Sequence, residues 1–369
     1  MAINLEVPRK FEQLVDQAHT VAVEIFRRNS RKYDLAEHTY PKELDMLAAI
    51  LDGMNEGGGM SGAGAGTVGS GASSGNGTSG AERGGNRNGS NMASLLGLVE
   101  LCWGDVGLLL TMPRQGLGQA AIAAVAGEEQ LQRFGGKWAA MAITEPEAGS
   151  DSAAIRTTAR WDDDEQEYVL NGEKIFVTSG DRAELIVVWA SLDPSQGRAA
   201  IKSFVVERDN PGLKLDRLEH KLGIRASDTA NFVLTDCRVP RENLLGSPEI
   251  DSKRGFGGVM QTFDNTRPLV AGMAIGVARA CLDRTRELLG EAGVEVDYDR
   301  PLHSQPAAAA EYISMESDLE AARLLTLRAA WMADNRKPNS LQASMAKAKA
   351  GRTGTDIALR CVALAGSIG

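Results

Sequence analysis

The stretch AITEPEAGSD, which begins at residue 142, combines side chains that could bind a ligand. Pro146 and Gly149 lie three residues apart and favour a turn. Thr144 and Ser150 bring two hydroxyls to this turn, and Asp151 adds a carboxylate. A capped surface loop would use such side chains to hold its own backbone, whereas a cofactor clamp would direct them toward a bound molecule. These residues alone leave both interpretations open.

Apolar periodicity predicts the elements that must position this turn. Residues 8–54 carry apolar side chains at three- and four-residue steps, and the small apolar residues of 91–135 are typical of closely packed helices. Short runs rich in Val, Ile and Phe follow at regular spacing from residue 141, as expected for a β domain. The helical period then returns in three long segments, and Pro268 predicts a kink or irregularity in the first. The predicted fold class is α+β.

Three domains are predicted: an N-terminal helical domain (1–140), a central β-barrel or β-sandwich domain (141–248) and a C-terminal helical bundle (249–369). Residues 57–90 interrupt the first domain with 14 of the chain's 41 glycines. This composition buries too little apolar surface to offset the entropy of ordering, so a flexible insertion is predicted. It is either a tolerated surface loop or a regulatory or partner-contacting one. In the β domain, Asn171-Gly172 between two apolar runs predicts a hairpin turn.

Composition argues against several classes of protein. The 43% of hydrophobic and 24% of charged residues are ordinary for a soluble chain of 369 residues. A net charge of −9 argues against nucleic acid and anionic membrane surfaces as main partners. Neither a membrane span nor a signal peptide is expected. Scattered cysteines and histidines favour a reduced, cytoplasmic protein without a metal site. These residues are Cys102, Cys237, Cys281, Cys361, His19, His38, His220 and His303.

Five motifs resemble the acyl-CoA dehydrogenase family, in the family's order and along nearly the whole chain. They are EEQLQRFG, TEPEAGSD, LNGEKIFVTSG, LGIRASDTANFVLTDCRVPRENLLG and FDNTRPLVAGMAIGVARACLD. The resemblance implies that FAD binds between the β domain and the C-terminal helices. It also implies that a hydride leaves Cβ of an acyl-CoA thioester while a carboxylate takes the α-proton.

The resemblance assigns flavin contacts to residues of two motifs. Thr144 would offer its hydroxyl and N–H to the edge of the isoalloxazine ring, where donors stabilise the reduced flavin. Met141 and Ile143 would line the ring. Phe176 stands where the family usually has Trp and would stack near the flavin, with Thr178 facing the ring edge. Core packing is the alternative for Phe176, and a turn hydroxyl is the alternative for Thr144.

Other matched residues are assigned to the substrate or to the rest of the cofactor. Ser150 would contact FAD or the thioester moiety of the substrate, and Gln305 matches a family Gln at the FAD site. Arg267 matches a family Arg beside the substrate pocket, with Asp264 close to it in sequence. Asp264 and Arg267 could equally form an i,i+3 surface pair.

Three departures from the family concern its chemistry. The chain stops at ALAGSIG, where the Gly-Gly motif before the usual catalytic carboxylate would begin. The other family position for the base holds Thr266, which cannot act as a base near neutral pH. Glu295, Asp297 and Asp299 occupy a region where many members place a cation for the FAD pyrophosphate. Ala363 stands where the last helix usually offers a Gln. The catalytic residue is therefore unknown.

Two interpretations follow from these departures. The chain is either an FAD-dependent acyl-CoA dehydrogenase of fatty-acid or related lipid metabolism whose base lies in a further segment, or a half-site or structural subunit of a heteromeric dehydrogenase. An acyl-CoA oxidase and a flavin monooxygenase on the same fold are further alternatives. The expected partners are acyl-CoA, an electron-transfer flavoprotein and other chains in a homo- or hetero-tetramer. The segments AGMAIGVARACL and AAAAEYISM are predicted inter-subunit surfaces.

Overall fold

The chain forms two compact units, which are described separately. The structure, a computed structural model, describes residues 7–48, 89–113, 117–250 and 257–368, with side chains for 266–367 in the last range. The helical unit comprises 7–29, 89–106 and 264–368, and the sheet unit comprises 30–48, 107–113, 117–250 and 257–263. The predicted glycine-rich insertion, 57–90, lies outside the described residues except for its last two. The division into three domains stays a prediction.

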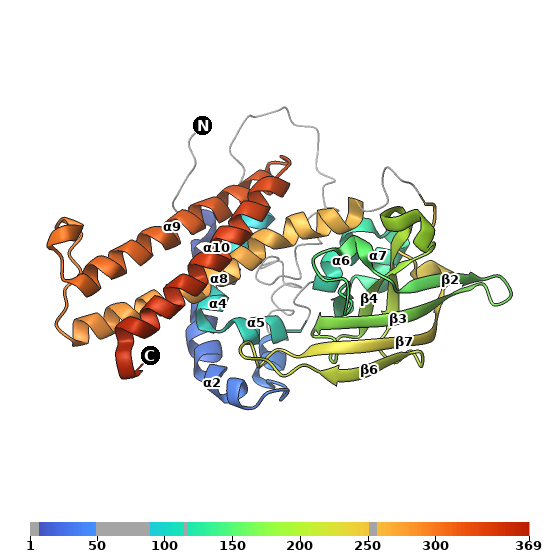
Figure 1. Cartoon of the computed structure of the whole chain (residues 1–369), viewed down its shortest axis with the longest axis horizontal. Helices are drawn as coiled ribbons and strands as arrows, with labels where there is room; N and C mark the ends of the chain where they lie inside the picture. Colours follow the sequence, from blue (N-terminus) through green and yellow to red (C-terminus); the bar gives the residue numbers. More distant parts are fainter. Residues whose placement is uncertain (1–6, 49–88, 114–116, 251–256, 369) are drawn as a thin grey trace. The chain divides into compact units, whose positions relative to one another are not determined.

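A seven-stranded mixed sheet forms the centre of the sheet unit (Figure 1). The strand order is β1-β4-β2-β3-β7-β6, and β5 pairs with β4. β4 pairs parallel with β1 and β2, and the other pairs are antiparallel. The strands are β1 (Ala139–Ala142), β2 (Thr158–Asp162), β3 (Glu167–Thr178), β4 (Leu185–Ser191), β5 (Ile201–Glu207), β6 (Leu213–Leu218) and β7 (Thr229–Pro240). The α+β fold class and the central β region are confirmed.

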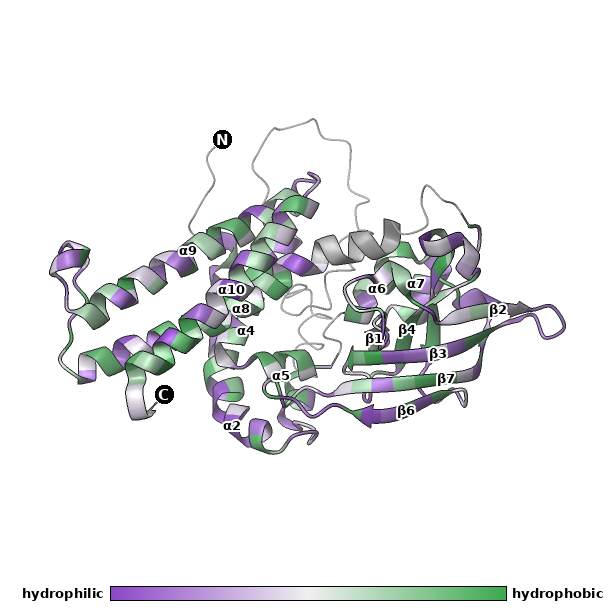
Figure 2. Cartoon of the chain, viewed as in Figure 1, coloured by the Kyte–Doolittle hydropathy of each residue, from purple (hydrophilic) through white to green (hydrophobic). Residues whose placement is uncertain are grey.

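The sequence LIVVWAS makes β4 the most deeply buried strand, because all seven of its residues are buried. Ile186 and Val188 pack with Phe204 in one core cluster, and Leu185 packs with Ile122 in a second. β6 is an edge strand and carries Lys, Asp and Arg, which Figure 2 shows as hydrophilic. Two short helices, α6 (Leu117–Val125) and α7 (Glu128–Phe134), contribute residues to the second cluster. A third, α5 (Val106–Thr111), is hydrogen-bonded to Ser179 and Ala226.

The helical unit is built on long helices whose small and apolar residues face one another. Tyr312, Met315 and Ile357 are buried in its core. At Gly276 an added Cβ would lie 2.5 Å from the Val99 carbonyl oxygen, so α8 and α4 approach backbone to backbone. The helices are α1 (Glu12–Val21), a π-helical segment (Ala22–Arg27), α2 (Arg28–Leu35, shared with the sheet unit), α4 (Ser90–Gly104), α8 (Gly257–Glu291), α9 (Ala307–Asp334) and α10 (Ser340–Ala365).

A side chain distant in sequence caps the N-terminus of α4. Asp334, the last residue of α9, accepts hydrogen bonds from the N–H groups of Gly89, Asn91 and Met92 at 2.6, 3.0 and 3.1 Å. These N–H groups have no carbonyl partner in the first turn of the helix, and a carboxylate also complements the helix dipole. The start of α4 is therefore completed by the end of α9.

The hairpin predicted at Asn171-Gly172 is wrong, because both residues lie inside the continuous strand β3. The β2–β3 connection is instead residues 163–166. Gly172 has φ 155°, and a Cβ there would lie 2.4 Å from Thr157 Oγ1. The Asn171 side chain accepts the N–H of Asp236 at 2.9 Å. The pair thus marks a register shift and a close approach within the sheet, not a chain reversal.

The long C-terminal helices agree with the predicted segments. α8 continues through Pro268 as a single helix. No helix among the described residues has the length and apolar character needed to cross a bilayer.

Candidate functional site

The buried carboxylate of Glu145 holds the TEPEAGSD turn in place. The chain leaves β1 at Ala142, and Glu145 and Ala148 exchange two backbone hydrogen bonds of 3.1 Å around Pro146. The Glu145 side chain points inward and accepts the N–H groups of Arg156 and Thr157 at 2.6 and 3.0 Å, and the Thr157 hydroxyl. This carboxylate ties the turn to the start of β2.

Lys174 of β3 completes the support of the turn. Its Nζ donates to Glu145 Oε1 at 2.7 Å and to the Ile143 carbonyl at 3.1 Å, and the side chain is fully buried. Burial lowers the pKa of Lys174 to about 8, against the opposing effect of Glu145. Burial raises the pKa of Glu145, but the charge and hydrogen bond of Lys174 outweigh it and leave that pKa lowered. The 2.7 Å contact therefore stabilises the charged form of each group against the effect of burial.

Thr144 lies between these two anchored residues, and its own polar groups remain available. Its carbonyl accepts the N–H of Ile175 at 2.9 Å, which fixes the backbone against β3. Within the described residues, neither its hydroxyl nor its N–H has a hydrogen-bond partner. Its side chain is half-buried. The turn thus holds two hydrogen-bond donors on a rigid support, and none of the described residues accepts from them.

Phe176 is the exposed aromatic residue next to this turn. The β3–β7 register shifts between Lys174 and Val177, and Phe176 in the shift has φ 59° with 57% of its surface exposed. A left-handed backbone is unusual for a bulky residue, and an exposed ring gains little from burial. The fully buried Asn231 holds this conformation, because its Oδ1 accepts the Phe176 N–H at 3.1 Å. The sheet thus presents the ring outward at a conformational cost.

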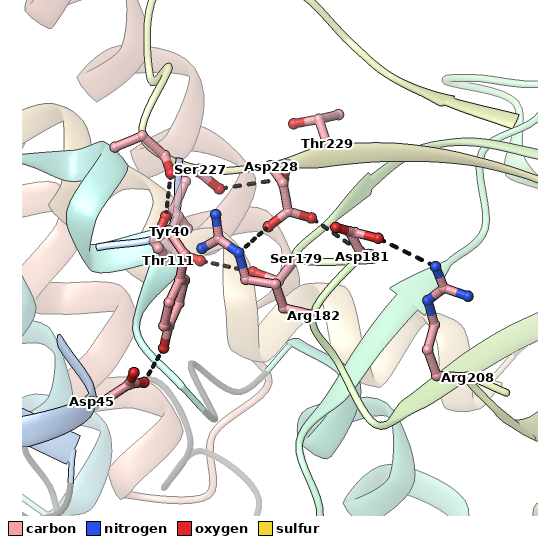
Figure 3. Close-up of polar contacts among 12 residues, drawn as sticks. Tyr40, Asp45, Thr111, Ser179, Asp181, Arg182, Arg208, Ser227, Asp228 and Thr229 are labelled. Atoms are coloured by element: carbon pink, nitrogen blue, oxygen red, sulfur yellow. Dashed lines mark hydrogen bonds and ion pairs between the residues drawn. The ribbon is translucent and has the colours of Figure 1, made fainter. Parts of the chain in front are cut away.

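A polar network supports the end of β3 beyond Thr178 (Figure 3). Ser179 has φ 57° and donates its hydroxyl to the Leu110 carbonyl at 2.9 Å. The buried Asp228 carboxylate accepts the N–H of Asp181 at 3.0 Å and lies 3.6 Å from Arg182 Nε. Burial is the main cause that raises the pKa of Asp228 and lowers that of Arg182. These contacts fix the chain reversal that follows Thr178.

The other residues predicted at the flavin lie in different surroundings. Met141 is half-buried on β1, and Thr178 is half-buried at the end of β3, paired in register with Thr229. Ser150 is exposed in the turn. Ile143 is buried in the second core cluster with Ile122, so its side chain packs within the sheet unit. The sheet unit thus brings Thr144 and Phe176 together, since Ile175 bridges them.

Three predicted site residues belong to the helical unit or to its boundary. The Asp264 side chain lies outside the described residues, and Arg267 is half-buried on α8. Gln305 follows a short 3₁₀ turn, and its Nε2 donates to the carbonyls of Asp297 and, at 3.0 Å, Arg300. Its Oε1 is buried without a hydrogen-bond partner in the described part of the chain. Gln305 therefore holds the acidic 297–300 loop, and its role toward FAD stays a prediction.

Sequence reasoning missed the three residues that support the site, Glu145, Lys174 and Asn231. Lys174 and Asn231 are polar residues in β-forming runs, Glu145 lies in the turn motif itself, and all three are buried. A buried Lys inside a strand requires a partner, so Lys174 in the run EKIFV was a usable signal. Its partner, 29 residues earlier, had no local signature.

Two family models match the chain. One is described as "Acyl-CoA dehydrogenase, middle domain" and matches residues 140–237, and the other as "Acyl-CoA dehydrogenase, C-terminal domain" and matches residues 253–369. The first covers the turn and Phe176, and the second covers the described part of the three long helices.

Curated relatives and solved structures agree with these matches. The mitochondrial short-chain specific acyl-CoA dehydrogenase of Mus musculus is 40% identical over 235 residues, which are 64% of this chain and 55% of that protein. The short-chain specific acyl-CoA dehydrogenase of Megasphaera elsdenii is 33% identical over 279 residues, 74% of this chain and 70% of that protein. The structure of butyryl-CoA dehydrogenase from Megasphaera elsdenii aligns with a TM-score of 0.79 and 28% identity, covering 100% of this chain and 90% of that one.

The match to the mouse relative spans little more than half of that protein's length. The relative from Megasphaera elsdenii is matched over more than two thirds of its length and of this chain. Both family models fall in the order that the sequence motifs predict. The chain belongs to the acyl-CoA dehydrogenase family.

Proposed function

We propose that this chain is an FAD-dependent dehydrogenase that removes the α-proton and the β-hydride of a short acyl-CoA thioester. The observation that carries the proposal is the pairing of exposed Phe176 with the unsatisfied donors of Thr144. The relatives named for short-chain and butyryl substrates support a short acyl group.

The residues of the sheet unit fit a flavin edge. A planar ring system requires an apolar face to pack on, and the exposed ring of Phe176 offers one. The electron-rich edge of the ring requires hydrogen-bond donors, and Thr144 offers an N–H and a hydroxyl without partners in the described residues. Left-handed φ at Phe176 has a cost that stacking on a cofactor would offset.

FAD, when bound, supplies the acceptor for the β-hydride. The chain's own contribution is positioning. Thr144 would donate to the flavin edge, Phe176 would stack beside the ring, and Thr178 would add a hydroxyl at the same side. The Glu145–Lys174 pair would keep Thr144 from moving, because it ties both ends of the turn to β2 and β3. Ser150, Asp264 and Arg267 are proposed substrate contacts.

The family position for the base that falls among the described residues holds no carboxylate. Thr266, at one family position for the base, is buried on α8 and is not a base. A second candidate function is therefore a half-site or structural subunit of a heteromeric dehydrogenase. The acidic 297–300 loop favours it. Arg300 lies next to the region where many family members place a cation for the FAD pyrophosphate, and it already pairs with Asp297 at 3.8 Å.

The remaining proposals concern the cellular compartment, the oligomeric state and the electron acceptor. We propose a cytoplasmic protein, because all four cysteines are free thiols. A homo- or hetero-tetramer is supported by exposed apolar residues on α10, among them Leu359 and Val362. An electron-transfer flavoprotein is the proposed acceptor of electrons from the reduced flavin.

Flavin content per chain tests this function. We expect about one FAD per chain in the purified wild type, and Phe176→Ala should weaken FAD binding at least about twofold, since one stacked aromatic pair contributes roughly 0.5–1.5 kcal/mol beyond its buried area. Phe176→Trp should retain the cofactor. Ile250→Ala is the matched control, because Ile250 is an exposed apolar residue of the same unit.

The outcomes separate the two candidate functions. Flavin in the protein alone, lost in Phe176→Ala but not in Ile250→Ala, supports a self-sufficient flavin site. Flavin only after co-expression with a related chain supports the heteromer. Equal flavin in Phe176→Ala and wild type contradicts the proposed role of Phe176, and no flavin under either condition contradicts both functions.

A further inference from the structure

Three potential metal ligands meet within the sheet unit, where the segment after α2 contacts the β6–β7 connection. Glu37 and His38 follow α2, and His220 lies two residues after β6. One ligand atom from each residue lies within 4.8 Å of the others. Two imidazoles and a carboxylate thus come together from segments 183 residues apart.

Of these three residues, His38 is the one whose ring lacks hydrogen bonds in the described part of the chain. Both of its ring nitrogens are buried and have no hydrogen-bond partner in the described residues. Its backbone has φ 64°, and its ring lies edge-on against the ring of His220 with centroids 5.1 Å apart. A buried nitrogen without a partner costs free energy, and a metal ion would use the lone pair of a neutral imidazole.

Glu37 adds a negative charge that is already oriented toward the two rings. Its Oε2 lies 2.9 Å from His220 Nδ1, and its Oε1 accepts the Lys221 N–H at 2.8 Å. Arg225 also lies 3.4 Å from Glu37 Oε2, so the carboxylate is held between the two connections.

We propose that Glu37, His38 and His220 bind one divalent transition-metal ion, preferably Zn²⁺, with water as the fourth ligand. Two imidazoles and a carboxylate are a ligand set that Zn²⁺ accepts, whereas Ca²⁺ and Mg²⁺ prefer oxygen ligands alone. Such a site goes beyond the dehydrogenase function and does not depend on it.

The geometry requires only a small closure. Metal–ligand bonds of about 2.0–2.1 Å in a tetrahedron set the ligand atoms roughly 3.3 Å apart. The three atoms therefore approach by at most about 1.5 Å from their 4.8 Å limit. His220 can supply this movement, because its side chain is 84% exposed. Arg225 lies 3.4 Å from Glu37 Oε2, a weak contact that the metal would displace.

The ion would act as a clip between two connections of the sheet unit. Glu37 already joins these connections through its contacts with Lys221 and Arg225. A metal bond to His38 would add a further link between the connections and would give a partner to a ring nitrogen that has no hydrogen bond in the described residues. Binding of an ion to the folded state alone stabilises that state.

The test is a titration of the full chain with Zn²⁺ alone, followed by calorimetry or by competition with a chromogenic chelator. We expect one ion per chain and a rise in Tm. His220→Ala and His38→Ala should each weaken binding at least about tenfold, because one of three protein ligands is lost. His303→Ala is the matched control, since His303 is exposed on a 3₁₀ turn of the helical unit.

Three outcomes would overturn the site. One is the absence of stoichiometric Zn²⁺ binding by the folded wild type. Another is wild-type affinity in both His220→Ala and His38→Ala, which would place the ion elsewhere, for example on a thiol. The third is equal weakening in His303→Ala. Circular dichroism confirms folding of each variant, and the exposure of His220 makes its substitution the variant that least disturbs packing.

Discussion

At the scale of single residues, a buried ion pair sets the position of the turn that carries Thr144. Lys174→Met should lower the free energy of unfolding by about 3–5 kcal/mol, because it leaves the Glu145 carboxylate buried without its cation. The double variant Lys174→Met with Glu145→Gln should lose less, because no unpaired charge remains. Urea unfolding measures both. Arg284→Met is the control, since Arg284 and Glu287 form an exposed surface pair, and such pairs contribute little to stability.

A loss from Lys174→Met no larger than that from Arg284→Met would contradict this role of the pair.

Phe176 shows how much of a single residue's role the sequence could predict. An aromatic residue at position 176 was evident from the motif, but its left-handed backbone depends on a register shift against β7. Local sequence does not specify such a shift, because it is decided by pairing with residues more than 50 positions away.

At the scale of elements, the contact between α8 and α4 requires a residue without a side chain at position 276. Gly276→Ala should destabilise the helical unit by about 1–3 kcal/mol, because a Cβ would lie 2.5 Å from the Val99 carbonyl and 2.8 Å from Cys102 Cβ. Gly351→Ala in α10 is the matched control, since nothing lies within 4 Å of its Cβ position. That control should instead stabilise its helix by up to about 1 kcal/mol. Thermal unfolding distinguishes the two signs.

Destabilisation by both variants, or by neither, would mean that the close approach at Gly276 is not required. Elements themselves were well predicted where apolar periodicity is long, as in α9 and α10. The turn at Asn171-Gly172 was not, because the same dipeptide can serve a hairpin or a bulge inside a strand. Here the close approach of Thr157 to Gly172 identifies the bulge inside a strand.

At the scale of the whole molecule, exposed apolar residues on α10 predict assembly. Leu359 and Val362 are 66% and 53% exposed and lie one turn apart. The segment AGMAIGVARACL, predicted from sequence as a surface between subunits, instead contributes Ala271, Ile275 and Leu282 to the core of the helical unit. Periodicity marks an apolar face but does not show whether it is covered by the same chain.

Leu359→Asp should therefore shift the protein to a smaller assembly, because a charge buried in an interface is unfavourable. Analytical ultracentrifugation measures the change. Leu35→Asp is the control, since Leu35 is 64% exposed on α2. A monomeric wild type, or an unchanged assembly in Leu359→Asp, would remove the support for this surface.

The cap on α4 has a consequence for synthesis of the chain. Asn91 and Asp334 are 243 residues apart, so the ribosome makes α4 long before the carboxylate that completes its first turn. At roughly 5–20 residues per second, this delay is on the order of ten to fifty seconds. During that time α4, in which ten of fifteen residues are buried in the finished structure, exposes apolar surface in the nascent chain. Until the end of α9 emerges, the first turn of α4 lacks its cap, so the helical unit is complete only late in translation.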